Sequence, residues 1–296
     1  MNGPVIIALP GNEKIAAQLA IKLNGSLGEL DTRQFPDQET YLRVATEVSG
    51  RTVIVVSTLD RPDVKFLRLM FALSTARDLG AKSVGLVAPY LAYMRQDKRF
   101  HDGEAITSRK FAGLLSRECD WLVTVDPHLH RYASLDEIYS IPSGVAQSAP
   151  LIADWISKSV ERPILIGPDM ESEQWVRAVA ASAQSPYVVL EKTRFGDRKV
   201  GIEMPDMTQW RDRTPVLIDD IVSSAQTMIE TCQHLIGNGL PKPICLAVHA
   251  LLSNDAYKSL REITSSIVTT NTVDHETNRI DVSAVISAEV SRLIAL

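Results

Sequence analysis

Short apolar segments of strand length alternate with segments of helix length along almost the whole chain. In the first half, strands are indicated at Val5–Leu9, Thr52–Ser57, Ser83–Pro89 and Trp121–Val125, and helices at Glu13–Leu23, Pro62–Leu79 and Ala105–Cys119. A second block has strands at Pro163–Gly167, Pro186–Glu191, Val216–Asp219, Ile244–Leu251 and Ser266–Thr270. Its helices are indicated at Glu171–Ala183, in the segment after Val216–Asp219 that continues to about Gly237, at Asp255–Ile263 and near Ala288–Ala295. This alternation predicts an α/β protein with two similar domains, each a mostly parallel sheet flanked by helices.

The serine- and proline-containing stretch Ser140–Pro150 separates the two blocks. It predicts domains at residues 1–146 and 147–296, with the closing helix able to pack back on the first domain. Early in the first block, Ser26–Phe35 and Glu39–Ala45 are predicted to be a pair of strands joined by a turn, because apolar and polar residues alternate along them.

The bulk composition narrows the class of protein. A net charge of −5 and a pI near 5.7 argue against a nucleic-acid or membrane-surface partner, although a local basic pocket for a small anion remains possible. The three cysteines have no metal-type spacing, so we expect reduced core thiols and a cytoplasmic protein. No segment has the length and apolarity of a signal peptide or a membrane span.

The stretch Val216–Met228 carries the most chemical information. A short apolar strand ends at the pair Asp219 and Asp220, and a hydroxyl-rich turn then opens a helix. The helix N-terminus offers N–H groups and a positive dipole end to a phosphate, while the carboxylates can accept from ribose hydroxyls. The alternative is an acidic pair that merely caps the helix, and this stretch alone leaves the two interpretations about equal.

A dense basic cluster, Arg95-Gln96-Asp97-Lys98-Arg99, follows the predicted strand Ser83–Pro89 and two tyrosines. Three cations within five positions can hold polyphosphate, and the neighbouring aromatic and amide groups can address a purine. A solvated charge run is the alternative. We favour the ligand, because the rest of the chain is acidic.

Other polar residues follow strands or open loops. His128 and Asp169 each come just after a strand, where an imidazole or a carboxylate can meet a Mg²⁺–nucleotide complex, whereas His130 is more simply a loop histidine. Lys192 and Arg194 open a polar segment to Lys199 that can close over a transferring phosphoryl group. An exposed hairpin with basic residues for solubility is the alternative for that segment. The chain has no Walker A, G-x-G-x-x-G, H-E-x-x-H or G-x-S-x-G motif.

Taken together, these motifs resemble the ribose-phosphate pyrophosphokinase family from the first strand to the last helix. The ordered matches are Phe35-Pro36-Asp37-Gln38-Glu39, Pro89-Tyr90 to Arg95-Gln96-Asp97, Glu104-Ala105-Ile106-Thr107, Thr124-Val125-Asp126-Pro127-His128, Pro168-Asp169, Lys192-x-Arg194 and Thr270-Asn271-Thr272. The resemblance implies two domains of the type I phosphoribosyltransferase kind. It also implies transfer of the β,γ-diphosphoryl group of ATP to the 1-hydroxyl of ribose 5-phosphate, giving phosphoribosyl pyrophosphate and AMP.

The resemblance also implies roles for individual residues. ATP would be bound by Phe35, Asp37, Glu39, Arg95, Gln96, Asp97 and His128, with the first three reaching adenine from a neighbouring subunit. Ribose 5-phosphate would be bound by Asp219, Asp220, Ser223, Ser224, Ala225, Gln226 and Thr227. His128 and Asp169 would serve Mg²⁺, and Lys192 and Arg194 the charge of the transferred group. The family habit of a shared nucleotide pocket implies a homo-oligomer, a dimer or a hexamer built of dimers.

One departure from the family pattern concerns the sugar-phosphate loop. The family has two glycines where this chain has Ala225 and Gln226, and Gln38 replaces a glycine of the adenine loop. A residue with a Cβ at a position that requires a positive φ costs about 1 kcal/mol. A non-catalytic, regulatory paralogue that assembles with an active synthetase is therefore the alternative to an active diphosphokinase. A phosphoribosyltransferase that uses the product is a more distant third.

Overall fold

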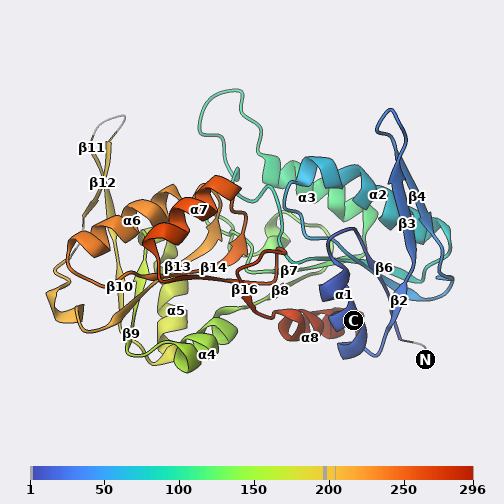
Figure 1. Ribbon diagram of the computed structural model, residues 1–296. Coiled ribbons are helices and arrows are strands. Elements are labelled where there is room, and N and C mark those ends of the chain that lie inside the picture. The colour runs from blue at the N-terminus through green and yellow to red at the C-terminus, as the bar shows by residue number, and fades with distance from the viewer. Residues whose placement is uncertain (1–2, 196–198, 204, 296) are drawn as a thin grey trace. The chain divides into compact units, whose positions relative to one another are not determined.

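The computed structural model describes residues 3–195, 199–203 and 205–295, without the side chains of residues 171, 174, 191–195 and 199–203. The chain divides into two compact units, Met1–Gln147 with Val282–Leu296, and Ser148–Asp281 (Figure 1). Each unit has one six-stranded sheet and its own buried core. Among the described residues, no helix is long and apolar enough to cross a membrane.

Six parallel strands form the sheet of the first unit, in the order β2-β1-β5-β6-β7-β8. Their bounds are Val5–Ala8 (β1), Ser26–Gly28 (β2), Thr52–Val56 (β5), Ser83–Ala88 (β6), Trp121–Val125 (β7) and Ser143–Ala146 (β8). Helices α2 (Pro62–Asp78) and α3 (Thr107–Glu118) cover one face, and α1 (Glu13–Lys22) and α8 (Ser283–Ile294) the other (Figure 1). Central strands covered on both faces read as continuous apolar runs, which is why the sequence pattern located them.

Helix α2 shows how the sequence sets the bounds of an element. A proline lies in its first turn, and Gly80 follows its end with a left-handed φ of 83°. Of the apolar residues along one side of α2, Leu69 and Leu73 are fully buried, whereas Phe66 and Met70 are only partly buried. Fewer residues of α2 are therefore fully buried than its apolar sequence alone would indicate.

The strands β3 (Leu30–Gln34) and β4 (Thr40–Val44) form an antiparallel hairpin, which confirms the expected pair from Leu30 onward. The first part of the predicted strand Ser26–Phe35 is instead β2, which pairs with β1 in the parallel sheet. Its register pairs Leu30 with Val44 at the base and Gln34 with Thr40 next to the turn. Gln38, which replaces a family glycine, has a left-handed φ of 73° in that turn. The hairpin stands apart from the sheet, and α2 packs against β4 at its base (Figure 1).

The second unit repeats the architecture. Its parallel sheet has the order β10-β9-β13-β14-β15-β16. The strands are Pro163–Gly167 (β9), Tyr187–Val189 (β10), Thr214–Val222 (β13), Ile244–Ala250 (β14), Ser266–Thr270 (β15) and Asn278–Ile280 (β16). Helices α6 (Gln226–Gly237) and α7 (Asn254–Ile263) cover one face, and α4 (Ala149–Ser159) and α5 (Glu173–Ala183) the other (Figure 1).

Several features of the fold were not predicted from the sequence, among them the short strand β16. The stretch around Ser140–Pro150 contains β8 and the beginning of α4, in place of an irregular junction. β8 has only four residues, one of them a glycine, and is too short to show a period of two. The proline near the start of α4 resembles a break in the sequence, although the first helical turn tolerates it. The closing helix α8 begins at Ser283, five residues before the predicted Ala288.

Candidate active site

The sugar-phosphate loop joins β13 to α6. β13 runs on to Val222, because its backbone continues to pair with β14 at Ile221–His249 and Val222–Ala250. Asp219 and Asp220 therefore lie inside the hydrogen-bonded strand, just before its end. The strand was predicted to end at Asp219, and the structure corrects that bound to Val222. The loop residue Ala225 has a left-handed φ of 57° and leads directly into the helix.

The amino terminus of α6 is open to a ligand. No side chain caps this helix, so its first N–H groups have no partner within the helix itself. Ser224 is exposed, and Ser223 and Thr227 are partly exposed, so three hydroxyls surround the same turn. The amide of Gln226 points away along the helix and donates to Glu230 Oε1 at 2.6 Å. The side chain that replaces the family glycine therefore does not fill the loop.

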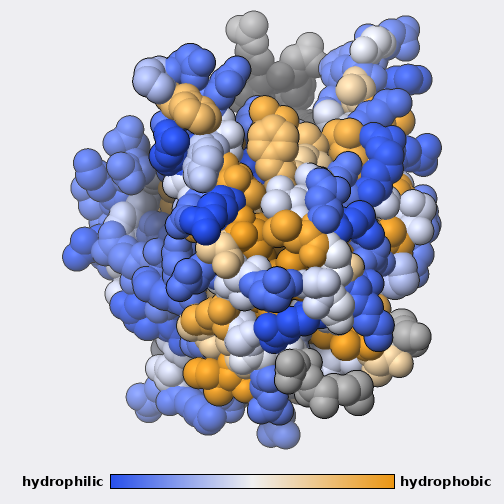
Figure 2. Space-filling model, turned by 90° about the vertical axis from the view of Figure 1, so that its right-hand side faces the viewer, coloured by the Kyte–Doolittle hydropathy of each residue, from blue (hydrophilic) through white to orange (hydrophobic). Residues whose placement is uncertain are grey.

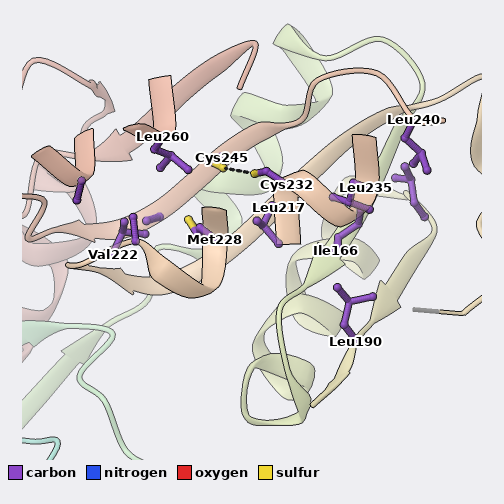
Figure 3. Close-up of a cluster of buried hydrophobic side chains, with 14 of the residues drawn as sticks. Ile166, Leu190, Leu217, Val222, Met228, Cys232, Leu235, Leu240, Cys245 and Leu260 are labelled. Atoms are coloured by element: carbon purple, nitrogen blue, oxygen red, sulfur yellow. Dashed lines mark hydrogen bonds between the residues drawn. The ribbon is translucent and has the colours of Figure 1, made fainter. Parts of the chain in front are cut away.

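A hydrophobic core supports this loop from below (Figure 3). Val222, Ala225 and Met228, which flank the turn, are all buried in the cluster that α6 and α7 form with the sheet. In the same cluster the Sγ atoms of Cys232 on α6 and Cys245 on β14 lie 3.5 Å apart. The start of α6 is thus anchored by packing, and its N–H groups are held in one direction.

Three carboxylates interact near the loop. Burial raises the pKa of Asp219 well above its usual value, and the charges of Asp220 and Asp169 raise that pKa further. Asp169 follows β9, and one oxygen of its carboxylate accepts from the Ser172 N–H at 3.2 Å. In the described part of the chain, no three His, Cys, Asp or Glu side chains converge as a complete metal site. A Mg²⁺ ion commonly takes one or two protein carboxylates and completes its shell with phosphate and water, so the acidic group fits such an ion.

The predicted ATP residues of the first unit occupy two adjacent loops and the hairpin tip. On the loop after β6, Arg95 is exposed, Gln96 is partly exposed and Asp97 is buried. Asp97 forms an ion pair with Arg131. On the loop after β7, the rings of His128 and His130 lie 3.9 Å apart between centroids, edge to face.

The tip of the β3–β4 hairpin carries an exposed aromatic and charged group. Phe35, Asp37 and Glu39 are all exposed, and the Glu39 N–H donates to the Asp37 carboxylate at 3.2 Å. The guanidinium of Arg33 lies 4.7 Å from the ring centroid of Phe35 and 4.6 Å from that of Tyr41. A flat ring held on one side by a cation leaves its other face for an aromatic ligand.

Lys192 and Arg194 lie on β11 (Glu191–Phe195), which pairs antiparallel with β12 (Lys199–Glu203). The backbone register places Lys192 opposite Ile202 and Arg194 opposite Val200. The segment predicted as a loop is thus a hairpin for all but residues 196–198, which lie outside the described residues. The two basic side chains also lie outside them.

The family relationship follows from comparisons with known proteins. Residues 4–118 match the N-terminal domain of ribose phosphate pyrophosphokinase, and residues 134–286 match the phosphoribosyl transferase domain. The ribose-phosphate pyrophosphokinase of Saccharolobus solfataricus is 32% identical over 298 residues, which covers 99% of each chain. The chain belongs to the ribose-phosphate pyrophosphokinase family.

Further relatives agree with this family. The ribose-phosphate pyrophosphokinase of Methanobrevibacter smithii is 30% identical over 292 residues, which covers 94% of this chain and 97% of the relative. A crystal structure of phosphoribosylpyrophosphate synthetase from Mycobacterium smegmatis superposes with a TM-score of 0.86 at 20% identity, covering 99% of each chain. The expected fold, two phosphoribosyltransferase-type domains with mostly parallel sheets, is confirmed. The family is one of enzymes, and it is consistent with a metal-dependent transfer.

The structure groups some of the predicted residues and adds others to them. It brings Asp219, Asp220 and the loop to Thr227 together, and Asp169 interacts electrostatically with Asp219. Arg131 was not predicted from the sequence, where it is one more cation in a loop. Only its tertiary contact with the buried Asp97 distinguishes it.

Proposed function

We propose that this chain transfers the β,γ-diphosphoryl group of ATP to the 1-hydroxyl of ribose 5-phosphate, and releases AMP and phosphoribosyl pyrophosphate. The observation that carries the proposal is the sugar-phosphate loop, an acidic pair at the end of β13 followed by an uncapped helix start. It occurs in a chain that matches the family over nearly its whole length.

Ribose 5-phosphate fits this loop for two reasons. The N–H groups and the positive dipole end of α6 suit the 5-phosphate, with hydroxyls of Ser223, Ser224 and Thr227 as further donors. The carboxylates of Asp219 and Asp220 suit the vicinal ribose hydroxyls, which are donors. We assign the backbone of Ala225 and Gln226 to the phosphate as well, since the Gln226 side chain is turned towards Glu230.

ATP fits the polar loops and the hairpin of the first unit. We assign Phe35 to stacking on adenine, and Asp37 and Glu39 to its amino and ring edge, because all three are exposed at the hairpin tip. Arg95 and Gln96 are the accessible members of their loop and suit the phosphates and the nucleoside. His128 is assigned to the phosphates.

The transfer joins the ribose O1 to the β-phosphorus and breaks the bridge between the α- and β-phosphates, so that AMP leaves and the hydroxyl proton is released. We assign Lys192 and Arg194 to the negative charge on the transferred group, a role that usually supplies much of the rate enhancement of phosphoryl transfer. Mg²⁺ would be held by Asp169 and phosphate oxygens and would neutralise phosphate charge.

The test is direct product formation. The purified chain incubated with Mg²⁺, ATP and ribose 5-phosphate should form AMP and phosphoribosyl pyrophosphate in equal amounts. Without ribose 5-phosphate, AMP should not form. An absence of AMP in the complete mixture would favour the regulatory paralogue instead.

The regulatory alternative draws its support from the missing glycines, and the conformation of the loop weakens that support. Ala225 adopts the left-handed conformation without a glycine, and its methyl group is buried in the core. A left-handed alanine costs about 1 kcal/mol, which corresponds to about a fivefold change in an equilibrium. That penalty is too small to remove a binding site.

Replacing Ala225 with glycine should therefore change little. Relief of the left-handed strain contributes about 1 kcal/mol, and loss of the buried methyl costs about 0.8 kcal/mol. We expect the free energy of unfolding to stay within about 1 kcal/mol and the KM for ribose 5-phosphate to change less than fivefold. Ala225→Val is the contrasting variant, because a β-branched residue is poorly tolerated at positive φ and should destabilise the second unit in urea denaturation.

We also propose a homo-oligomer, and α2 carries the supporting observation. Val64, Leu67 and Phe71 form a stripe on one face of α2, with side chains 75%, 60% and 44% exposed. Figure 2 shows that apolar groups are exposed among polar ones on one face of the molecule. Because α2 packs against β4, this stripe lies beside the hairpin whose tip is assigned to adenine. A second copy that covers the stripe would also meet the hairpin.

Leu67→Glu should shift the protein to a smaller species in light scattering, because a charge in an apolar interface is costly. If the hairpin serves a neighbouring subunit, the KM for ATP should rise in parallel. Ile236→Glu, at an exposed apolar position of α6, is the matched control and should leave the mass unchanged. An unchanged mass in Leu67→Glu would exclude the α2 stripe as the interface.

A further inference from the structure

The two loops of the candidate ATP site are joined by an ion pair whose carboxylate is buried. Arg131 Nη1 donates to Asp97 Oδ1 at 2.8 Å and to Oδ2 at 3.1 Å. The Asp97 side chain is 3% exposed, whereas that of Arg131 is 44% exposed. A buried carboxylate requires a cation or several donors, so Asp97 depends on this arginine.

A second, uncharged contact joins the same loops. The Tyr132 hydroxyl donates to the backbone oxygen of Asp97 at 3.1 Å and lies 3.1 Å from Ser108 Oγ. The Ser108 N–H in turn donates to the backbone oxygen of Gln96 at 3.3 Å. Asp97 is therefore held through both its side chain and its backbone, and the neighbouring Gln96 is held through α3.

The position of Asp97 makes a direct nucleotide contact a poor use of its carboxylate. Both carboxylate oxygens accept from Arg131, and the side chain is almost fully buried. A carboxylate would also repel a triphosphate if it faced one. By contrast, Arg95 on the same loop is exposed.

We propose that Arg131 is a positioning residue of the ATP site and that Asp97 acts through it. The ion pair fixes the loop that carries Arg95 and Gln96 against the loop that carries His128. The ligand then meets groups that are already in place, so less ordering has to accompany binding. This inference rests on the proposed function for the identity of the nucleotide.

Asp97→Asn removes the negative charge and is the decisive variant, because the two possible roles of Asp97 predict opposite effects. A purely electrostatic role predicts tighter ATP binding, because a negative charge is removed near a polyanion. A positioning role predicts weaker binding, because Arg131 loses its charged partner. We expect the Kd for Mg²⁺–ATP by calorimetry and the KM for ATP to rise about 10- to 100-fold, as a misplacement of about 1 Å can produce.

Arg131→Met should show the same rise, with an unchanged KM for ribose 5-phosphate and a kcat within about threefold of the original. Arg131→Lys keeps the positive charge but lacks the planar guanidinium group. Its KM for ATP should therefore lie between that of the original protein and that of Arg131→Met. The double variant Asp97→Asn/Arg131→Met should be no worse than the poorer single variant, since both remove one interaction. Arg117→Met, an exposed cation on α3, is the matched control and should bind ATP normally.

Three results would overturn the proposal: tighter ATP binding in Asp97→Asn, normal ATP binding in Arg131→Met, or a double variant whose loss equals the product of the two single losses. The last would mean that Arg131 and Asp97 act independently on the ligand. Calorimetry does not require turnover, so it reports on Arg131 even if no AMP forms. A failure of the proposed function is thus distinguishable from a failure of this inference.

Discussion

Lys192→Ala should lower kcat for AMP formation about 100- to 1000-fold while changing both KM values only a few-fold. The reason is that a cation aimed at the transferred group stabilises charge that develops in the transition state more than charge in the bound substrates. The measurement is steady-state AMP formation with each substrate varied in turn. A loss that appears in KM rather than in kcat would assign Lys192 to ground-state binding.

The matched control for this variant is Lys158→Ala. Lys158 lies on α4 of the same unit, is exposed, and pairs with Asp154 at the surface. Removing an exposed lysine of this kind should leave the rate within experimental error. Equal losses in Lys158→Ala and Lys192→Ala would mean that positive charge in general, and not the position of Lys192, supports the reaction.

Asp219→Asn should raise the stability of the unliganded protein and at the same time weaken ribose 5-phosphate binding. Burial, Asp220 and Asp169 raise the pKa of the Asp219 carboxyl in the folded state. A raised pKa means that the folded protein binds this proton more tightly than the unfolded chain, so stability falls as pH rises from the unfolded pKa of about 3.9 through the higher folded pKa. Above that pH range the ionised Asp219 carboxylate lowers the stability of the folded protein. Asparagine carries no charge and removes this effect.

Two measurements check this variant. At pH 8 the Tm of the second unit should rise by about 2–4 °C, the shift that about 1 kcal/mol gives in a domain of 150–250 residues. The KM for ribose 5-phosphate should rise about 10- to 150-fold, because a hydrogen bond to a charged acceptor contributes about 1.5–3 kcal/mol. A lower Tm would mean that the Asp219 charge is stabilised in the absence of ligand.

Asp206→Asn is the control, because its expected effect on stability has the opposite sign. Asp206 is exposed, and hydrogen bonds from Thr208 lower the pKa of its carboxylate. Its contribution to stability is present above the unfolded pKa and is lost as pH falls through the folded pKa. The asparagine variant should therefore lose a little stability at pH 8 and keep a normal KM for ribose 5-phosphate.

The sequence located the strands that are buried on both faces, because such strands read as unbroken apolar runs. β5, β6, β7 and β14 all appear within about one residue of their predicted bounds. It failed at β8, which has four residues, and at α4, where a proline resembles a break. Local periodicity has too few repeats in such segments to separate strand, helix and loop.

For the candidate site, too, the sequence supplied part of the information and the structure supplied the rest. The order of motifs was enough to indicate the family, whereas the composition of Val216–Met228 left a phosphate and sugar site and a simple helix cap about equal. The sequence also pointed to the replaced glycines. Only the structure gave their conformation, a positive φ at Ala225 and at Gln38. It also turned the Gln226 side chain away from the loop.

By itself, then, the sequence determined the α/β class through the pattern of its strands and helices, and its ordered motifs indicated the family and the residues proposed for the ligands. The tertiary structure decided which polar groups are buried and what they face. The sequence assigns Asp97 to ATP by its motif, and the structure adds that it is buried and paired with Arg131, 34 positions away. Burial, together with the charges of Asp220 and Asp169, raises the pKa of Asp219. Burial and charge are set by neighbours from distant segments, and no local pattern records them.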